Sequence, residues 1–289
     1  MVKENRYLIC LGLPKFGTTF LQRLLDLHPE ISCPSEINLT HTIDRVVQLL
    51  HDFDTDTEMM DRRTGGQGTT PVFDKVFPRL IHVALSSIVD ARAKGAAVIG
   101  VSDNSLLRRH QHNLDRLEIL HAVFDGPKYL ALVRNPLDSA MSAIRHNKRL
   151  AEAEADDAHL EVISKAGGEK AFAKLYARHF AEYVLNIDRL ISEGKDVLTV
   201  RYEDLVTDKT ATTNQILRWL GVGHDAEVVA HLVENSSIDR MRKLSSQPSF
   251  FGAGSVNFAG AWADETLLEE IGAIAGQALA RCRYNLGRG

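Results

Sequence analysis

The stretch LICLGLPKFGTTFL, residues 8–21, decides the fold of this chain. The apolar run from Tyr7 to Leu13 predicts a buried strand, and the apolar spacing that follows predicts an amphipathic helix that ends at His28 and Pro29. The loop between these elements contains a lysine, two glycines and two threonines. Backbone N–H groups and the positive end of the helix dipole point at one spot in such a turn. The sequence therefore predicts a phosphate or sulfate site at this loop.

The spacing of the loop differs from that of a Walker A motif, in which a lysine follows the second glycine directly. Gly12 and Gly17 keep the glycine spacing, but Thr18 stands at the lysine position and Lys15 lies inside the loop. This places the ammonium group nearer the bridging oxygen at the 5′ end of a bound nucleotide than beside a β/γ-phosphate pair. A P-loop phosphotransferase remains an alternative, but no acidic Mg²⁺ ligand is visible at the end of a strand. For the loop taken alone, a structural turn with a solvated lysine is a further alternative.

A second anion motif follows the apolar run KYLALV, residues 128–133, which predicts another buried strand. Asn135 can cap a helix, the next residue is a proline, and Asp138 favours the helix dipole. Arg134 therefore lies at the carboxyl end of the strand, and Ser142 lies about two turns into the helix. The planar guanidinium group suits a phosphate, and open α/β sheets bind ligands at the carboxyl ends of their strands. The alternative is that Arg134 pairs with a carboxylate and Ser142 only packs.

These motifs resemble those of the PAPS-dependent sulfotransferases (PAPS is 3′-phosphoadenosine 5′-phosphosulfate). Lys15-Phe16-Gly17-Thr18-Thr19-Phe20 is similar to the 5′-phosphosulfate loop of that family, although the family usually has serine at the Phe16 position. Arg134 to Asp138 with Ser142 resembles its 3′-phosphate motif. Val200-Arg201-Tyr202-Glu203-Asp204-Leu205 resembles a late strand in which a tyrosine often lies near the adenine. The motifs occur in the expected order from Tyr7 to at least Leu220.

The resemblance implies a P-loop-like three-layer α/β fold, with a central parallel sheet flanked by helices. It implies transfer of a sulfuryl group from PAPS to a hydroxyl or amine acceptor, with PAP as the product and without a metal. The alternation of predicted strands and helices agrees with such a sheet. The resemblance assigns cofactor binding to Lys15, Phe16, Gly17, Thr18, Thr19, Phe20, Arg134, Ser142 and Tyr202. Lys15 is also a catalytic residue, because it meets the charge that develops on the leaving phosphate oxygen.

The general base has several candidates. Glu36 follows the first helix, where several bacterial, carbohydrate and protein-tyrosine sulfotransferases carry a catalytic glutamate. Asp103 lies where the small-molecule branch of the family carries a histidine. His110 and His112 lie further downstream and are more typical of surface residues. The choice between Glu36, Asp103 and a histidine stays open.

The C-terminal part departs from the family pattern. An Arg-Lys-Gly-type segment that grips the 3′-phosphate is absent, and Arg240, Arg242 and Lys243 are candidates to replace it. The missing segment, together with the open choice of base, supports a second alternative, a catalytically silent nucleotide-binding protein. Retention of both anion motifs argues against that alternative.

Composition bounds the remaining possibilities. The chain has 289 residues, which we interpret as a single domain over 1–289, with mobile loops near 52–72, 147–168 and 244–262. A net charge of −4 at pH 7 argues against a general nucleic-acid-binding protein. Three cysteines, a polar N-terminus and the lack of a run of ~18 apolar residues favour a cytoplasmic protein without a membrane span. The acceptor can be a small molecule, a carbohydrate or a lipid-like alcohol, and the sequence does not determine the oligomeric state.

Overall fold

The structure is a computed structural model of the chain. It describes residues 6–33, 95–102, 126–154, 156–244 and 262–286, together with the scattered positions 45, 48, 49, 52, 55, 56, 58–60, 62, 63, 83, 120, 121 and 124.

The described strands form a five-stranded parallel sheet in the order β2-β3-β1-β4-β5. The strands are β1 (Arg6–Leu11), β2 (Ile31–Ser32), β3 (Val98–Ser102), β4 (Lys128–Val133) and β5 (Val197–Arg201). The three middle strands β3, β1 and β4 are almost wholly buried, which explains why their sequences are continuous apolar runs. The prediction of a central parallel sheet is confirmed.

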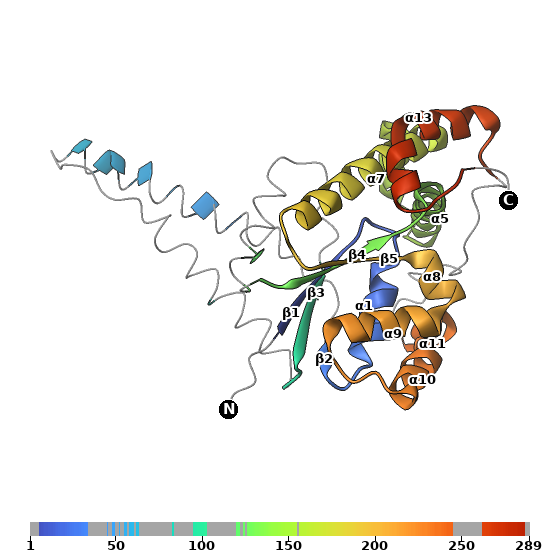
Figure 1. The fold of residues 1–289 in the computed structure, drawn as a ribbon. Coiled ribbons are helices and arrows are strands. Elements are labelled where there is room, and N and C mark those ends of the chain that lie inside the picture. Colours follow the sequence, from blue (N-terminus) through green and yellow to red (C-terminus); the bar gives the residue numbers. More distant parts are fainter. Residues whose placement is uncertain are drawn as a thin grey trace.

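Helices cover both faces of the sheet (Figure 1). Their bounds are α1 (Thr18–Asp26), α5 (Pro136–Glu154), α6 (Ala158–Lys165), α7 (Glu169–Ser192), α8 (Tyr202–Thr207), α9 (Lys209–Leu220), α10 (Ala226–Asn235), α11 (Ile238–Leu244) and α13 (Glu265–Arg281). Helices α5, α7 and α13 form one layer, and α1, α9 and α10 lie on the opposite face. This is the three-layer arrangement that the sequence predicts.

Helix α7 shows how the pattern of apolar residues positions the layer formed by α5, α7 and α13. Its buried side chains recur at three- and four-residue spacing from Phe172 to Leu190, so one stripe of the helix faces the core. Phe180 and Tyr183 on this stripe are fully buried. The Tyr183 hydroxyl donates to the carbonyl of Leu132 in β4, at 3.1 Å. The long helix is therefore fixed to the sheet close to the carboxyl end of β4.

The stretch 147–168 is helical instead of the loop that the sequence suggests. Helix α5 continues to Glu154, and α6 covers most of the remainder. Only Ile163 of α6 is buried, so the apolar stripe that normally identifies a helix is missing. Alanine and charged residues are nevertheless strong helix formers, and an i,i+4 pair joins Lys165 to Glu161 at 2.7 Å. The described positions of the predicted loop at 52–72 all lie between 52 and 63 and are helical, so the loop prediction is wrong there, and the rest of that range lies outside the described residues. The predicted loop at 244–262 is described only at its two end residues.

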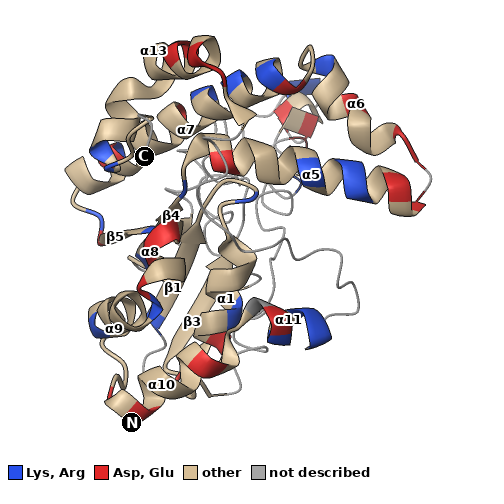
Figure 2. Cartoon of the chain, turned by 90° about the vertical axis from the view of Figure 1, so that its right-hand side faces the viewer, with Lys and Arg blue, Asp and Glu red and all other residues tan. Residues whose placement is uncertain are grey.

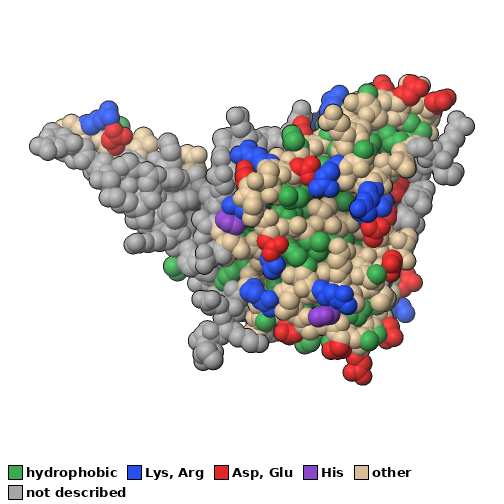
Figure 3. All heavy atoms as spheres, viewed as in Figure 1, with side chains coloured by type: hydrophobic (Ala, Val, Ile, Leu, Met, Phe, Trp, Pro, Cys, Tyr) green, Lys and Arg blue, Asp and Glu red, His purple; other side chains and the backbone are tan. Residues whose placement is uncertain are grey.

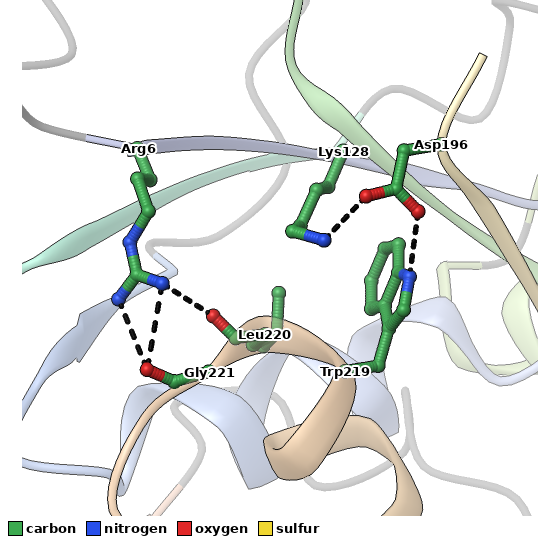
Figure 4. Close-up of polar contacts among 6 residues, drawn as sticks. All are labelled: Arg6, Lys128, Asp196, Trp219, Leu220 and Gly221. Carbon is green, nitrogen blue, oxygen red and sulfur yellow. Dashed lines mark hydrogen bonds and ion pairs between the residues drawn. The ribbon is translucent and has the colours of Figure 1, made fainter.

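The amino ends of the strands carry a cluster of charged side chains that hold α9 against the sheet (Figure 4). Arg6 donates to the carbonyls of Leu220 at 2.7 Å and Gly221 at 3.4 Å, which places a cation at the C-terminus of α9. Lys128 pairs with Asp196, whose other oxygen accepts the indole N–H of Trp219 at 2.8 Å. We call these residues the amino-edge cluster.

Charges of both signs are interspersed over the face drawn in Figure 3. Cys10, Cys33 and Cys282 are buried and form no disulfide. Within the part of the chain that the structure describes, no helix is long and apolar enough to cross a membrane.

Candidate functional site

The strand order creates a switch point beside β1. The chain leaves β1 through α1 toward β2 and β3 on one side, whereas β4 pairs with β1 on its other side. In open parallel sheets, ligands bind in the crevice outside the carboxyl ends of the strands at such a point. The loop after β1 and the loop after β4 meet there. These are the two loops that carry the predicted anion motifs.

The loop after β1 exposes the N-terminus of α1. Lys15 and Gly17 both adopt left-handed backbone conformations, with φ of 67° and 95°. Gly17 caps α1 without a side-chain hydrogen bond, and the first helical hydrogen bond runs from the N–H of Leu21 to the carbonyl of Gly17, at 3.0 Å. The N–H groups of residues 17–20 precede that bond and have no intrahelical acceptor. The loop is therefore built to present N–H donors and a positive dipole end to an anion.

Phe16 anchors this loop in the core. Its side chain is fully buried, with its ring centroid 6.3 Å from that of Phe180 and 5.7 Å from that of Tyr183. Its N–H donates to the carbonyl of Leu13 at 3.1 Å. The side chain of Phe16 therefore fixes the loop from beneath, and the assignment of this residue to cofactor binding stays a prediction. The family usually has a small serine at this position, so the side chain here gains apolar burial that serine lacks.

Both glycines of the loop are required by close packing. A Cβ atom at Gly12 would lie 2.4 Å from the methyl group of Thr18, and a Cβ atom at Gly17 would lie 2.4 Å from the ring of Tyr202. Thr18 is buried with 4% of its surface exposed, whereas Thr19 is half-buried. Thr19 is thus the more accessible hydroxyl of the pair.

Arg134 connects the second loop to the first. It follows β4 directly, its surface is 5% exposed, and its Nη1 donates to the carbonyl of Lys15 at 2.7 Å. Val133 is in register with Arg201, so Arg134 and Tyr202 leave the sheet side by side. The guanidinium carbon lies 4.3 Å from the centroid of the Tyr202 ring. The structure therefore brings Lys15, Arg134 and Tyr202 together, as the sequence predicts.

Tyr202 supports both loops at once. Its ring contacts Gly17 and lies beneath the guanidinium group of Arg134. It also makes an edge contact with Phe20, with 6.5 Å between the ring centroids. Burial raises the pKa of its hydroxyl, against the opposing effect of Arg134, so the side chain is neutral near pH 7. Lys209 at the start of α9 lies 5.2 Å from the Phe20 ring. Tyr202 and Phe20 are largely buried, which makes them a base for the two loops.

Helix α5 begins as predicted and brings a further residue to the site. Asn135 caps it, with its side-chain oxygen accepting the N–H of Leu137 at 3.0 Å. Ser142 is half-buried on this helix, and His146 follows it by four residues on the same face. Burial, together with the charges of Lys15, Arg149 and His159, lowers the pKa of His146 to about 4. The sequence analysis missed this neutral imidazole, although its i,i+4 spacing from Ser142 was a usable signal.

Glu203 is a second residue that the sequence analysis did not assign to the site. Helix α8 follows β5 directly (Figure 2). Glu203 lies in the first turn of this helix and is buried with 9% of its surface exposed. Its Oε1 accepts the N–H of Asn135 at 3.0 Å, next to Arg134. Its carboxylate thus touches the loop that carries the candidate phosphate-binding arginine.

The candidate bases lie outside the described residues. This holds for Glu36, Asp103, His110 and His112. The basic residues proposed to replace the missing C-terminal segment lie on α11, where Arg242 pairs with Asp239 at 3.1 Å and Arg240 and Lys243 are exposed. Among the described residues, no group of three or more His, Cys, Asp or Glu side chains is placed to hold a metal ion.

The family model and the similar proteins all indicate the same family. The model of a family described as the sulfotransferase family matches residues 8–226. Protein-tyrosine sulfotransferase A of Caenorhabditis elegans is 23% identical over 242 residues, 82% of this chain and 56% of that protein. Protein-tyrosine sulfotransferase 2 of Gallus gallus is 24% identical over 230 residues, 79% of this chain and 54% of that protein. The chain therefore spans little more than half the length of these relatives.

Solved structures share the fold. A sulfotransferase domain from the curacin biosynthetic pathway superimposes with a TM-score of 0.59 and 18% identity, covering 98% of this chain and 99% of that one. Mouse sulfotransferase SULT7A1 complexed with PAP gives a TM-score of 0.56 and 15% identity, covering 97% of this chain and 87% of that one.

Proposed function

The chain belongs to the sulfotransferase family, and from this premise we propose that it transfers a sulfuryl group from PAPS to an acceptor hydroxyl or amine. The observation that carries the proposal is the hydrogen bond from Arg134 to the carbonyl of Lys15, at 2.7 Å. It joins two loops that each have the chemistry of an anion site. Two such sites in contact suit a donor that has phosphate groups on both its 3′ and 5′ oxygens.

The residues present fit PAPS at both ends. The left-handed Gly17 and the N-terminus of α1 suit the 5′-phosphosulfate, and the buried Arg134 with Ser142 suits the 3′-phosphate. When bound, the donor supplies the sulfuryl group and a phosphate leaving group. A Cβ atom at Gly17 would displace the Tyr202 ring that supports Arg134, so the two ends of the site depend on one another.

Lys15 has the main catalytic role in this proposal. Its ammonium group and the N–H groups of residues 17–20 stabilise negative charge as it develops on the leaving oxygen. Arg134 and Ser142 hold the far end of the nucleotide so that attack on sulfur is in line. Glu36 takes the proton of the acceptor hydroxyl, with Asp103 or a histidine as the alternatives that a base assignment must exclude.

The acceptor is proposed from the names of the relatives and from the chemistry of sulfuryl transfer. The curated relatives are named for protein tyrosine, which makes a phenolic hydroxyl the acceptor to test first. A small molecule, a carbohydrate or a lipid-like alcohol remains the wider class. We also propose a reducing, cytoplasmic location, which the three buried free cysteines support.

Transfer of ³⁵S from labelled PAPS to a panel of acceptors tests the proposal. The panel contains a tyrosine peptide, a simple phenol, an oligosaccharide and a long-chain alcohol, and thermal melting with PAP or with ATP and Mg²⁺ accompanies it. We expect label on at least one acceptor and stabilisation by PAP. Stabilisation by ATP and Mg²⁺ alone would identify a phosphotransferase. Stabilisation by PAP without labelling of any acceptor or of a cell-extract fraction would identify a catalytically silent nucleotide-binding protein.

A further inference from the structure

Glu203 forms a buried bridge between segments that are far apart in the sequence. Its Oε1 accepts the N–H of Asn135 at 3.0 Å, and its Oε2 accepts the hydroxyl of Tyr284 at 2.6 Å. Asn135 directly precedes α5, whereas Tyr284 lies beyond the end of α13. A buried carboxylate is costly unless hydrogen bonds compensate its lost hydration. We call these three residues the Glu203 bridge.

The bond to Asn135 acts on Arg134 through the backbone. The N–H of Asn135 belongs to the same planar peptide group as the carbonyl of Arg134, so Glu203 fixes the plane of that peptide. On its other side, the Asn135 carbonyl accepts the N–H and the hydroxyl of Ser139, both at 3.0 Å. The direction in which Arg134 leaves β4 is therefore set partly by Glu203 and partly by the first turn of α5.

Tyr284 is a firmly held donor. Its surface is 5% exposed, its ring makes an edge contact with Phe180 at 6.0 Å, and its N–H donates to the carbonyl of Leu279 at 2.8 Å. The guanidinium carbon of Arg201 lies 4.6 Å from the ring centroid. Burial and the charge of Glu203 raise the pKa of the Tyr284 hydroxyl, so it keeps its proton and can donate it.

We infer that Glu203 and Tyr284 are positioning residues of the nucleotide site, which hold Arg134 in the orientation that grips the 3′-phosphate. The inference rests on the proposed function. It gives the segment after α13 a role at the loop that follows β4, although Tyr284 belongs to neither anion motif.

The prediction concerns discrimination between two ligands. PAP carries the 3′-phosphate that Arg134 grips, whereas 5′-AMP lacks it and relies on the α1 N-terminus. Tyr284→Phe removes the donor to Oε2 and leaves a buried acceptor without its partner, so Glu203 and the Asn135 peptide reorient. Calorimetry should show PAP affinity reduced on the order of tenfold, a usual size for coupling between groups that do not touch the ligand. The affinity for 5′-AMP should change by less than about twofold.

Tyr183→Phe is the matched control. It also removes one buried tyrosine hydroxyl, which donates to the Leu132 carbonyl at 3.1 Å, and it keeps the ring. Melting should show both variants destabilised, but Tyr183→Phe should keep the wild-type ratio of PAP to 5′-AMP affinity. A loss of stability alone therefore cannot produce the expected result.

Substitution of Glu203 adds a rescue. In Glu203→Gln, the amide oxygen can accept the Asn135 N–H and the amide nitrogen can donate to the Tyr284 hydroxyl, because a tyrosine hydroxyl both donates and accepts. This variant should keep most of the wild-type preference for PAP over 5′-AMP, whereas Glu203→Ala should lose that preference. Equal discrimination in the wild type, Tyr284→Phe and Glu203→Ala would overturn the inference and leave the proposed function intact. Failure of the wild-type protein to bind PAP would overturn the proposed function itself.

Discussion

The two ends of the same parallel sheet use basic side chains in different ways. At the amino-edge cluster, Arg6 neutralises the end of α9, and Lys128 pairs with Asp196 (Figure 4). At the carboxyl edge, the contacts described for Arg134 are with a backbone carbonyl and a neutral ring. The first set of cations fastens elements of the fold together, whereas we propose that Arg134 binds an external anion.

The difference follows from strand polarity and from the loops. Helices that follow parallel strands begin at the carboxyl edge, so their positive dipole ends and N–H groups gather there. Helix C-termini return to the amino edge, where a basic residue such as Arg6 finds acceptor carbonyls within the protein. Substitutions at the carboxyl edge should therefore alter ligand binding or rate, and those at the amino edge should alter stability.

The largest effect is expected from Lys15→Ala. Loss of the cation at the leaving oxygen should lower the rate of transfer by roughly a hundredfold to a thousandfold, equivalent to about 3–4 kcal/mol in the transition state. The measurement is single-turnover transfer of ³⁵S from PAPS to the acceptor identified in the panel. Lys128→Ala at the amino edge is the matched control and should leave the rate within about twofold. Equal losses in the two variants would contradict the comparison.

The next effect is expected from Arg134→Ala. Charge-assisted hydrogen bonds contribute about 1.5–3 kcal/mol, so the affinity for PAP should fall by roughly ten- to a hundredfold. Isothermal calorimetry measures this, with Arg6→Ala as the control that removes an arginine from the opposite edge. Unchanged PAP affinity in Arg134→Ala would remove the arginine from the nucleotide site.

A smaller effect is expected at the amino edge from Asp196→Asn. Burial opposes ionisation of Asp196, but hydrogen bonds from Lys128 and Trp219 outweigh it and lower its pKa below the ordinary 3.8. The resulting stability is present above pH ~4 and disappears as the pH falls through the lowered value. Because the side chain of Asp196 is 52% exposed, the free energy of unfolding at pH 7 should fall by less than ~1 kcal/mol. Urea unfolding at pH 7 and pH 3 checks this. An equal difference in the free energy of unfolding between the wild type and Asp196→Asn at both pH values would contradict it.

The smallest expected effect is a change in the pKa of His146 when PAP binds. The pKa of His146 is lowered to about 4, by burial and by the charges of Lys15, Arg149 and His159. A nucleotide phosphate beside Lys15 offsets that positive charge, so PAP should raise the pKa of His146 toward the ordinary 6.5. NMR titration of the histidine side chains, assigned with His146→Gln, gives both values. A pKa near 6.5 in the ligand-free protein would show that the imidazole does not lie in this basic environment.

The sheet could be predicted from the sequence wherever a strand is a long apolar run. The bounds of β4 are those expected from its sequence, and β1 differs by only a few residues. Strand β2 has two residues, too few for any pattern to identify, and α6 has a single buried residue. Strand β2 forms because of its neighbours in the sheet, and α6 forms because of its helix-forming residues and its packing. The periodic spacing of apolar residues in the sequence indicates neither.

The site could be predicted only in part, for a similar reason. The proximity of Lys15, Arg134 and Tyr202 could be predicted because each lies in a local motif at the end of a strand. Glu203 was not found, because its role depends on the register of β4 with β5 and on Tyr284, which lies 81 residues away. Phe16 was assigned to the ligand because its neighbours form the predicted anion motif, whereas its side chain is in the core.

The most direct test of the central claim is the electron density of crystals grown with PAP. The account predicts the 5′-phosphate against the N–H groups of residues 17–20 and the 3′-phosphate within hydrogen-bonding distance of Arg134. A nucleotide bound elsewhere, or one whose 3′-phosphate points into solvent away from Arg134, would contradict the account.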